Sequence, residues 1–292
     1  MTSVVIAAHN EESVIGRCLE ALAAQSVAAD LDVIVAANGC TDGTVEIARR
    51  YGVQVVETGL PGKAQALNLG ESVARDFPRV YLDADITLEP RVIESLVAAL
   101  QADSSLCAAV PTRRVDTSGS PWPVRSYTAI SNRLPAFAGG LFGRGVIALS
   151  ARGRSRFTTF PVVTADDLFL DSLFSADEKI VVGSVAVWVK SPRRTRDLLR
   201  RLTRVRRANG QLRRTGREAR SGTIRPADRM AWLTEVVLRE PRLAPAGLVY
   251  AALTLAAAAL ARRATDGSHQ WERDESTRGW SAGPGDREVR ES

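Results

Sequence analysis

The 292-residue chain contains only two histidines, His9 and His269. A catalytic triad that includes histidine, or a histidine-rich zinc site, is therefore not expected. The three cysteines, Cys18, Cys40 and Cys107, are scattered, odd in number and without metal-ligand spacing. They predict reduced thiols in a cytosolic protein rather than a disulfide framework.

Two common nucleotide-binding motifs are also missing. The sequence has no G-x-x-x-x-G-K-[ST] phosphate loop, and no G-x-G-x-x-G opens the first expected helix. These absences argue against a standard ATPase and against a dinucleotide oxidoreductase. The first apolar run, 4–8, is too short for a signal peptide and lacks a charged segment before it. We therefore expect the chain to stay in the cytoplasm.

The net charge of +6 is concentrated in one segment. Residues 193–220 contain twelve arginines and two acidic residues, which gives +10 and leaves −4 for the rest of the chain. Such a segment predicts an anionic partner (phosphate groups, an anionic lipid surface or nucleic acid), and a solvated basic helix is the alternative. Nucleic acid is the weakest of these because the segment lacks interleaved aromatic residues for base stacking.

The first 110 residues alternate between strand-like and helix-like segments. Short apolar runs predict five strands, at 4–8, 32–37, 53–56, 80–82 and 106–110. Helical periodicity lies between them, with Asn10 placed to cap the first helix and Pro90 to begin the fourth. This alternation predicts an α/β fold: a mainly parallel, Rossmann-like sheet with helices on both faces.

The second half of the chain is less regular. Residues 112–155 are rich in Gly, Pro, Ser and Arg, and we expect long loops there, with 139–145 as a lid or part of an acceptor site. Residues 181–189 predict a further strand, and the arginine-rich segment that follows is helix-like. The polar tail, 265–292, predicts disorder.

Residues 243–261 form a run of about 19 residues without a charge, between Arg242 and Arg262. That length is just enough to span a bilayer, but Pro245 and Gly247 interrupt its start. A transmembrane helix, a helix lying in the membrane interface and a helix packed on the core remain open.

Asp83 and Asp85 follow the expected strand 80–82, at the sheet edge where parallel α/β proteins bind ligands. Mg²⁺ and Mn²⁺ prefer oxygen ligands, and Mg²⁺ is often held by one or two carboxylates together with substrate phosphates. A metal there stabilises the charge that develops on a diphosphate leaving group. The alternative is a pair of aspartates with turn and cap roles.

Three further clusters carry chemistry. Lys63 follows Gly62 at the start of an expected helix, where phosphate binds well, although an ordinary turn fits too. Asp166 and Asp167 stand at the start of an apolar helix. One of them is suited to act as a general base with a like-charged neighbour; the alternative is that both only stabilise the helix N-terminus. Polar side chains after the first two strands are able to hydrogen-bond a base or ribose, or to act only as caps: Asn10, Glu12, Asn38 and Asp42.

Taken in order, these segments resemble the family-2 glycosyltransferases, which share the GT-A fold, from about residue 3 to residue 211. Residues 4–12, 35–44, 62–68, 83–85 and 166–170 are similar to five motifs of that family. Ala7 and His9 replace the usual Pro and Tyr, and Asn38 stands where an aspartate is common. The stretch 204–210 resembles a later Gln/Arg-x-x-Arg-Trp element only loosely and lacks its Trp.

The resemblance implies a role for each motif. Asp167 is then the catalytic base, and Asp166 orients the acceptor or the base. Asp85, with Asp83, holds Mg²⁺ or Mn²⁺. The implied donor contacts are Ala8, Asn10, Glu12, Asn38, Asp42, Lys63, Asp83, Arg204 and Arg207, with Arg206 as a competitor of the last two.

We therefore expect an inverting transfer of a single sugar from a nucleoside-diphosphate sugar, with a UDP-sugar favoured, to a hydroxyl acceptor. The acceptor would be lipid-linked or would serve envelope or polysaccharide synthesis at the inner face of the cell membrane. The alternatives are a nucleotidyltransferase that makes a nucleotide-sugar and a non-catalytic, membrane-tethered protein. The expected organisation is a donor-binding half (1–110), an acceptor-binding and catalytic half (111–220), C-terminal helices (221–263) and the tail (264–292).

Overall fold

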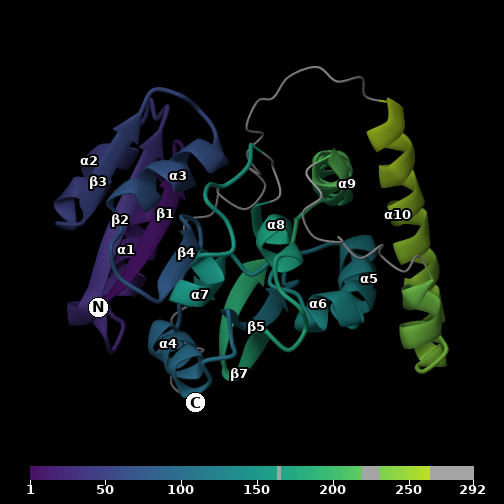
Figure 1. Cartoon of the computed structure of the whole chain (residues 1–292). Coiled ribbons are helices and arrows are strands. Elements are labelled where there is room, and N and C mark those ends of the chain that lie inside the picture. The colour runs from purple at the N-terminus through teal and green to yellow at the C-terminus, as the bar shows by residue number, and fades with distance from the viewer. Residues whose placement is uncertain (163–165, 219–229, 264–292) are drawn as a thin grey trace, which may run out of the picture.

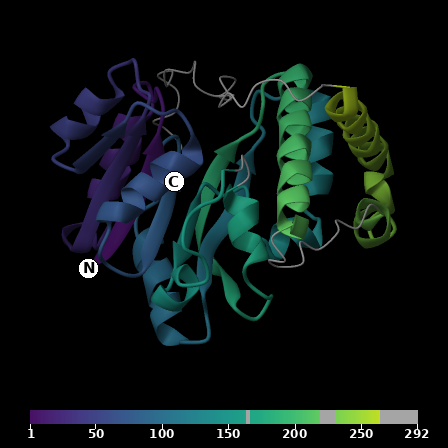
Figure 2. The same ribbon diagram turned by 45° about the horizontal axis from the view of Figure 1, so that its top comes forward.

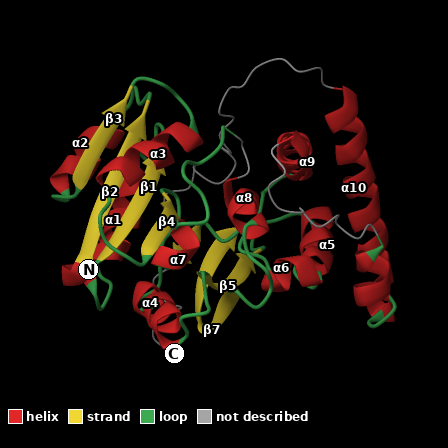
Figure 3. Ribbon diagram, in the orientation of Figure 1, coloured by secondary structure: helices red, strands yellow, loops and turns green. Residues whose placement is uncertain are grey.

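The computed structural model describes residues 1–162, 166–218 and 230–263, which form a seven-stranded sheet with helices on both faces (Figures 1 and 3). The strand order is β3-β2-β1-β4-β6-β5-β7, and among these strands only β6 runs antiparallel to its neighbours. The strands are β1 (Thr2–Ala8), β2 (Leu31–Asn38), β3 (Gln54–Thr58), β4 (Arg79–Asp83), β5 (Ala108–Asp116), β6 (Val146–Leu149) and β7 (Lys179–Lys190). The predicted α/β class with a mainly parallel sheet is confirmed.

Alternate residues of the central strands pack in two separate cores. Val4 and Ile6 of β1 face one core, whereas Val5 faces the other, because successive strand residues point to opposite faces. The first core is covered by α1 (Ile15–Ala23), α2 (Thr44–Arg50) and α4 (Val92–Ala102). The second is covered by α3 (Lys63–Val73) and α8 (Asp166–Ser172).

The C-terminal helices pack with α5 (Trp122–Ser131) in a third layer at one end of the sheet. There α5, the π-helical turn η2 (Trp232–Val237) and α10 (Ala244–Arg263) share a small apolar core. Figures 1 and 2 show α9 (Thr195–Glu218) between α8 and α10, with α10 outermost. The remaining short elements are η1 (Ala28–Asp30), α6 (Pro135–Gly139), α7 (Ala151–Arg154) and η3 (Pro241–Leu243).

Two predicted helix starts are wrong. Asn10 does not cap α1, which begins at Ile15; Asn10 has a left-handed φ of 53°, and its side chain accepts a hydrogen bond from the backbone of Thr41. Pro90 lies before α4 rather than in it. Leu88 forms an isolated β-bridge with Val187, and the chain then turns at Pro90 and at Arg91, which has a left-handed conformation, before α4 begins.

The prediction of long loops over 112–155 is also wrong, because α5, α6, β6 and α7 lie there. The four residues of β6 are too few for their pattern to mark a strand, but they pair with both β4 and β5 and complete the sheet. The boundary placed after residue 110 falls inside β5, so the two expected halves share one sheet. The expected disordered tail lies outside the described residues.

Candidate active site

The candidate site lies at the carboxyl ends of β1, β2 and β4. The sheet register pairs Ala7 with Asp83 and Ala8 with Ala37, so β1 ends between the two neighbouring strands. The polar turns that follow these strands are therefore neighbours in space, as expected for a ligand edge. β6 runs the other way, and its first residue, Val146, pairs with Leu82 close to the same edge.

Lys63 joins two carboxylate groups that are far apart in the sequence. Its ammonium nitrogen lies 2.7 Å from Oδ1 of Asp83 and 3.0 Å from Oδ2 of Asp166. The side chains of Lys63 and Asp166 are mostly buried, with 26% and 15% of their surface exposed. The end of β4, the start of α3 and the start of α8 thus meet at one ammonium group.

Burial and charge oppose each other in this cluster. Burial by itself lowers the pKa of Lys63, but the carboxylates of Asp166 and Asp83 outweigh it and raise that pKa well above its usual value. Burial raises the pKa of Asp166 to about 6; Asp167 and Asp83 act in the same direction, and Lys63 opposes them. Lys63 therefore stays a cation, and it is the counter-charge that an anionic Asp166 needs when buried.

Asp167 faces a different partner. Its Oδ2 accepts a hydrogen bond from the backbone N–H of Gly143 at 2.9 Å, and its Oδ1 accepts one from Leu168 at 2.8 Å. One turn later, Asp171 accepts a hydrogen bond from Leu141 N–H and forms an ion pair with Lys179 at 2.6 Å. The glycine-rich loop 139–145 is thus fixed to α8 at two points.

The same loop also contacts Asp83. The backbone N–H of Asp83 donates to the carbonyl of Gly145 at 2.8 Å. Gly145 has a left-handed φ of 70°, and a Cβ there would lie 2.4 Å from the side chain of Ile86 and 3.2 Å from Oδ2 of Asp83. Only glycine suits this conformation and this close approach.

Arg144 supports the loop through hydrogen bonds to backbone carbonyls. Its guanidinium group is buried, with 2% of the residue exposed, and it donates hydrogen bonds to five backbone carbonyls. The acceptors are the carbonyls of Pro111, Phe137, Ala138, Gly140 and Phe142. Burial, with the nearby charge of Arg113, lowers the pKa of Arg144 to about 10, which still leaves it charged near neutral pH. The sequence does not reveal the role of Arg144, because its partners are backbone atoms, which leave no motif.

Metal binding by Asp83 and Asp85 stays a prediction, and the surroundings of the two side chains bear on it. The side chain of Asp83 is 41% exposed, and Asp85 is exposed. The Cys18 thiol lies 3.9 Å from the carbonyl oxygen of Asp83. Burial, and then the charges of Asp85 and Asp83, raise the pKa of this thiol to about 12. Within the described ranges no group of three or more His, Cys, Asp or Glu side chains is suited to a metal ion. Two carboxylates fit Mg²⁺ or Mn²⁺ that also binds substrate phosphates, and do not fit a closed structural site.

Asn38 is fully buried and is bonded to the backbone. Its amide nitrogen donates to the carbonyl of Ala8 at 2.8 Å, and its oxygen accepts from the N–H of Gly62 at 2.9 Å. Asn38 thereby connects β1, β2 and the turn that carries Lys63. The structure thus gives Asn38 and Ala8 a supporting role at the sheet edge. Their contact with a donor stays a prediction.

The other two polar turns are hydrogen-bonded to each other. The backbone N–H of Glu12 donates to Asp42, and that of Gly43 donates to Glu12 at 2.9 Å. Asn10 contacts Thr41 in the same way, through its side-chain oxygen at 2.7 Å. These reciprocal bonds bring together three residues that we expected near the donor, Asn10, Glu12 and Asp42, and they fix the rim of the sheet edge.

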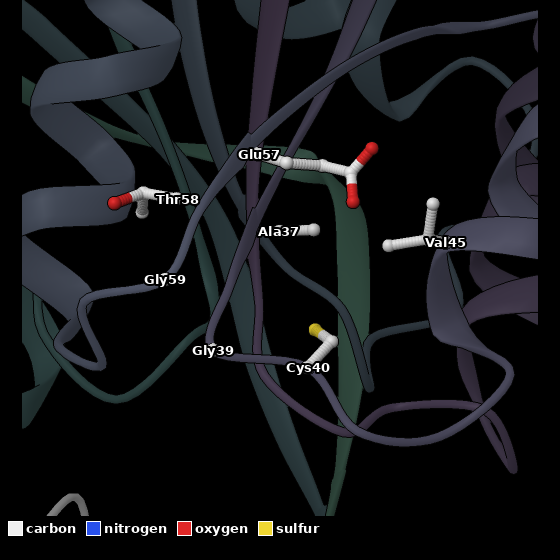
Figure 4. Close-up of a pocket in the computed structure, with 7 residues that line it drawn as sticks. All are labelled: Ala37, Gly39, Cys40, Val45, Glu57, Thr58 and Gly59. Carbon is white, nitrogen blue, oxygen red and sulfur yellow. The ribbon is translucent and has the colours of Figure 1, made fainter.

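A cavity of about 240 Å³ opens beside this rim, at the ends of β2 and β3. Figure 4 shows the carboxylate of Glu57, the Cys40 thiol and the methyl groups of Val45 around it. Glu57 and Cys40 are not among the residues that we expected at the site. Their position, directly at or after the ends of neighbouring parallel strands, is the signal that would have identified them.

The three candidate arginines lie on α9. Arg206 and Arg207 are exposed, whereas Arg204 is half-buried. Burial raises the pKa of Tyr127 and of Tyr250, and the charge of Arg206 partly opposes this rise in both. Arg206 therefore lies on the side of α9 that faces α5 and α10. A contact of Arg204 or Arg207 with a diphosphate stays a prediction.

Residues 3–152, which are 150 of the 292, match the family described as "Glycosyl transferase family 2". A chondroitin synthase of Pasteurella multocida is 32% identical over 126 residues, which cover 41% of this chain and 13% of the synthase. This chain thus corresponds to a small part of that relative.

Two solved structures share the fold. The mannosyltransferase PcManGT from Pyrobaculum calidifontis, in complex with GDP-Man and Mn²⁺, has a TM-score of 0.58 and 24% identity, over 89% of this chain and 77% of that one. A fragment of S. aureus TarS (1–349), in complex with UDP, has a TM-score of 0.51 and 17% identity, over 65% and 60%. Both support the GT-A fold.

Replacing Arg144 tests its role as the support of the loop. In Arg144→Met the buried carbonyls lose their donors, so we expect the free energy of unfolding to fall by roughly 3 kcal/mol. Arg144→Lys keeps the charge but has fewer donors, and its loss should be smaller. Chemical denaturation measures both.

Arg200→Met, at a side chain that is 77% exposed, is the matched control and should change stability by less than about 0.5 kcal/mol. An Arg144→Met protein as stable as this control would contradict the assignment.

Proposed function

Because the chain belongs to glycosyl transferase family 2, we propose that it transfers one sugar, with inversion, from a nucleoside-diphosphate sugar to a hydroxyl acceptor. The observation that carries this proposal is the Lys63 ammonium group, which unites Asp83 of the Asp-x-Asp motif with Asp166 of the second acidic pair. A donor diphosphate beside the first pair and an acceptor beside the second would be neighbours, as a single displacement requires.

The donor that we favour is a UDP-sugar. Its base would enter the cavity at the ends of β2 and β3, where Glu57 is able to accept a base N–H. The TarS fragment was solved with UDP. A GDP-sugar is the second candidate because PcManGT was solved with GDP-Man.

The residues suited to a divalent cation are Asp85 and Asp83. Bound there, Mg²⁺ or Mn²⁺ would neutralise negative charge that develops on the departing diphosphate. The solved complex of PcManGT contains Mn²⁺, which supports testing that ion first. Lys63 adds a fixed positive charge between the two acidic pairs.

Asp167 is the group that we assign as general base. It would accept the proton of the acceptor hydroxyl while the acceptor oxygen forms a bond to the anomeric carbon and the bond from that carbon to the diphosphate oxygen breaks. The nucleoside diphosphate leaves with the electron pair of that bond. The hydrogen bond from the Gly143 N–H to Oδ2 orients the Asp167 carboxylate. Asp166, held by Lys63, would orient the acceptor or Asp167 itself. Arg204 and Arg207 would contact the diphosphate.

For the acceptor we propose a lipid-linked hydroxyl, or one presented at the inner face of the cell membrane, in cell-envelope or polysaccharide synthesis. Among the described residues one helix, Pro241–Arg263, is long and apolar enough to cross a membrane by length and composition. The location that we propose is the cytoplasm, at that membrane face.

Donor binding tests the class directly. We expect one nucleoside-diphosphate sugar from a panel of UDP- and GDP-sugars to bind and be slowly hydrolysed with Mn²⁺ or Mg²⁺. Asp85→Ala should weaken metal-dependent binding at least about ten-fold, because one of two carboxylate ligands is lost. Calorimetry with and without metal measures this, and Asp30→Ala, at an exposed aspartate, is the control. If no donor binds in the presence of metal, the proposal fails.

Asp167→Asn separates catalysis from binding. The amide cannot accept the acceptor proton, so we expect kcat to fall by about 10²–10⁴ while donor affinity changes little. Single-turnover assays alongside donor titration measure the two quantities. A variant that keeps full turnover would remove Asp167 from the role of base.

A further inference from the structure

The outward face of α10 is apolar along the whole helix. Leu248 and Leu255 are 69% and 70% exposed, and Leu260 is 42% exposed. Alanines with the same spacing lie exposed between them, so a continuous stripe follows one face of the helix. Its members are Ala244, Pro245, Leu248, Ala252, Leu255, Ala256, Ala259 and Leu260.

A helix on the surface of a soluble protein normally presents charged or polar side chains to water. From Leu243 to Ala261 this chain has no charged residue, and its polar side chains there, Tyr250 and Thr254, are part-buried instead of lying in the stripe. Exposed leucines that occur singly are ordinary, but a stripe as long as a 20-residue helix, about 30 Å, marks an interaction surface.

The opposite face of α10 contacts the rest of the protein. Gly247 and Ala257 are buried, and Tyr250 stacks on Tyr127 of α5 with ring centroids 5.0 Å apart. A Cβ at Gly247 would lie 2.7 Å from Val237 and 3.0 Å from Trp232. Because the small residue is what allows this close approach, α10 is docked on η2 at Gly247, and it also contacts α5 and α9.

Arginines lie at both ends of the stripe. Arg239 and Arg242 precede α10; their side chains are 70% and 82% exposed and form ion pairs with Glu235 and Glu240. Arg262 and Arg263 are exposed at its last turn. Over residues 235–263 four arginines and two glutamates, Glu235 and Glu240, sum to +2. An apolar helix face with arginines at both ends matches a surface that is apolar inside and anionic outside.

We propose that α10 is a membrane-contact helix that lies in the plane of an anionic bilayer, with Leu248, Leu255 and Leu260 among the acyl chains and the flanking arginines at the lipid phosphates. Lying in the plane keeps the contacts of Gly247 and Tyr250, whereas crossing the bilayer would require α10 to leave them. Membrane binding by α10 does not depend on the proposed function. The further step, that the active site meets its acceptor at this membrane surface, rests on the proposed function.

Vesicle flotation tests the proposal. The full chain should float with vesicles of phosphatidylcholine and phosphatidylglycerol at low salt, and much less with pure phosphatidylcholine. Leu248→Gln and Leu255→Gln should each weaken binding about ten-fold, since each removes a leucine from the apolar phase. Leu60→Gln, at a leucine that is 67% exposed and far from α10 along the chain, should not change binding.

Three outcomes would overturn the inference. Equal vesicle binding by the α10 variants and by Leu60→Gln would remove the stripe as the contact. Resistance to extraction by alkaline carbonate from membranes would indicate a spanning helix. A dimer in light scattering that Leu248→Gln dissociates would indicate a second copy on this face. Donor hydrolysis measured without vesicles separates these outcomes from failure of the proposed function, because it does not depend on the stripe.

Discussion

The ammonium group of Lys63, held between Asp83 and Asp166, is the contact on which the arrangement of the site depends. Three carboxylates converge where β4 ends and α8 begins, and like charges in a part-buried place repel. One cation between them makes the approach possible. The buried Asn38 fixes the turn before Lys63, and the loop around Arg144 fixes Asp83 and Asp167 from the other side. The supports of the site are therefore largely backbone hydrogen bonds.

Much of this was predictable from the sequence. Short apolar runs separated by helical periodicity predicted β1 to β4 to within about two residues, because parallel strands buried on both faces are apolar throughout. The carboxyl-end rule then placed the polar turns at one edge, and the structure brings Asp83, Lys63 and Asp166 together there. Membership of the glycosyl transferase family agrees with the resemblance seen in those motifs.

What could not be predicted depends on contacts between distant segments. The strand β6 has four residues, and only its pairing with β4 and β5 makes it a strand. Arg144 looks like one more surface arginine in a glycine-rich loop until its five carbonyl partners are seen. The exposed stripe of α10 likewise became visible only when its inward face was placed on α5. Pro90 shows the reverse case, in which a good local signal is overruled by the β-bridge at Leu88.

A double-mutant cycle between Lys63→Met and Asp166→Asn, read as the free energy of unfolding, tests most directly whether Lys63 unites the two acidic pairs. Removing either partner of a part-buried ion pair leaves the charge of the other partner uncompensated. The two losses of unfolding free energy should therefore not add. The account predicts a coupling energy of about 1 kcal/mol or more. Effects that add to within about 0.5 kcal/mol would contradict it, because they would mean that Lys63 and Asp166 act independently.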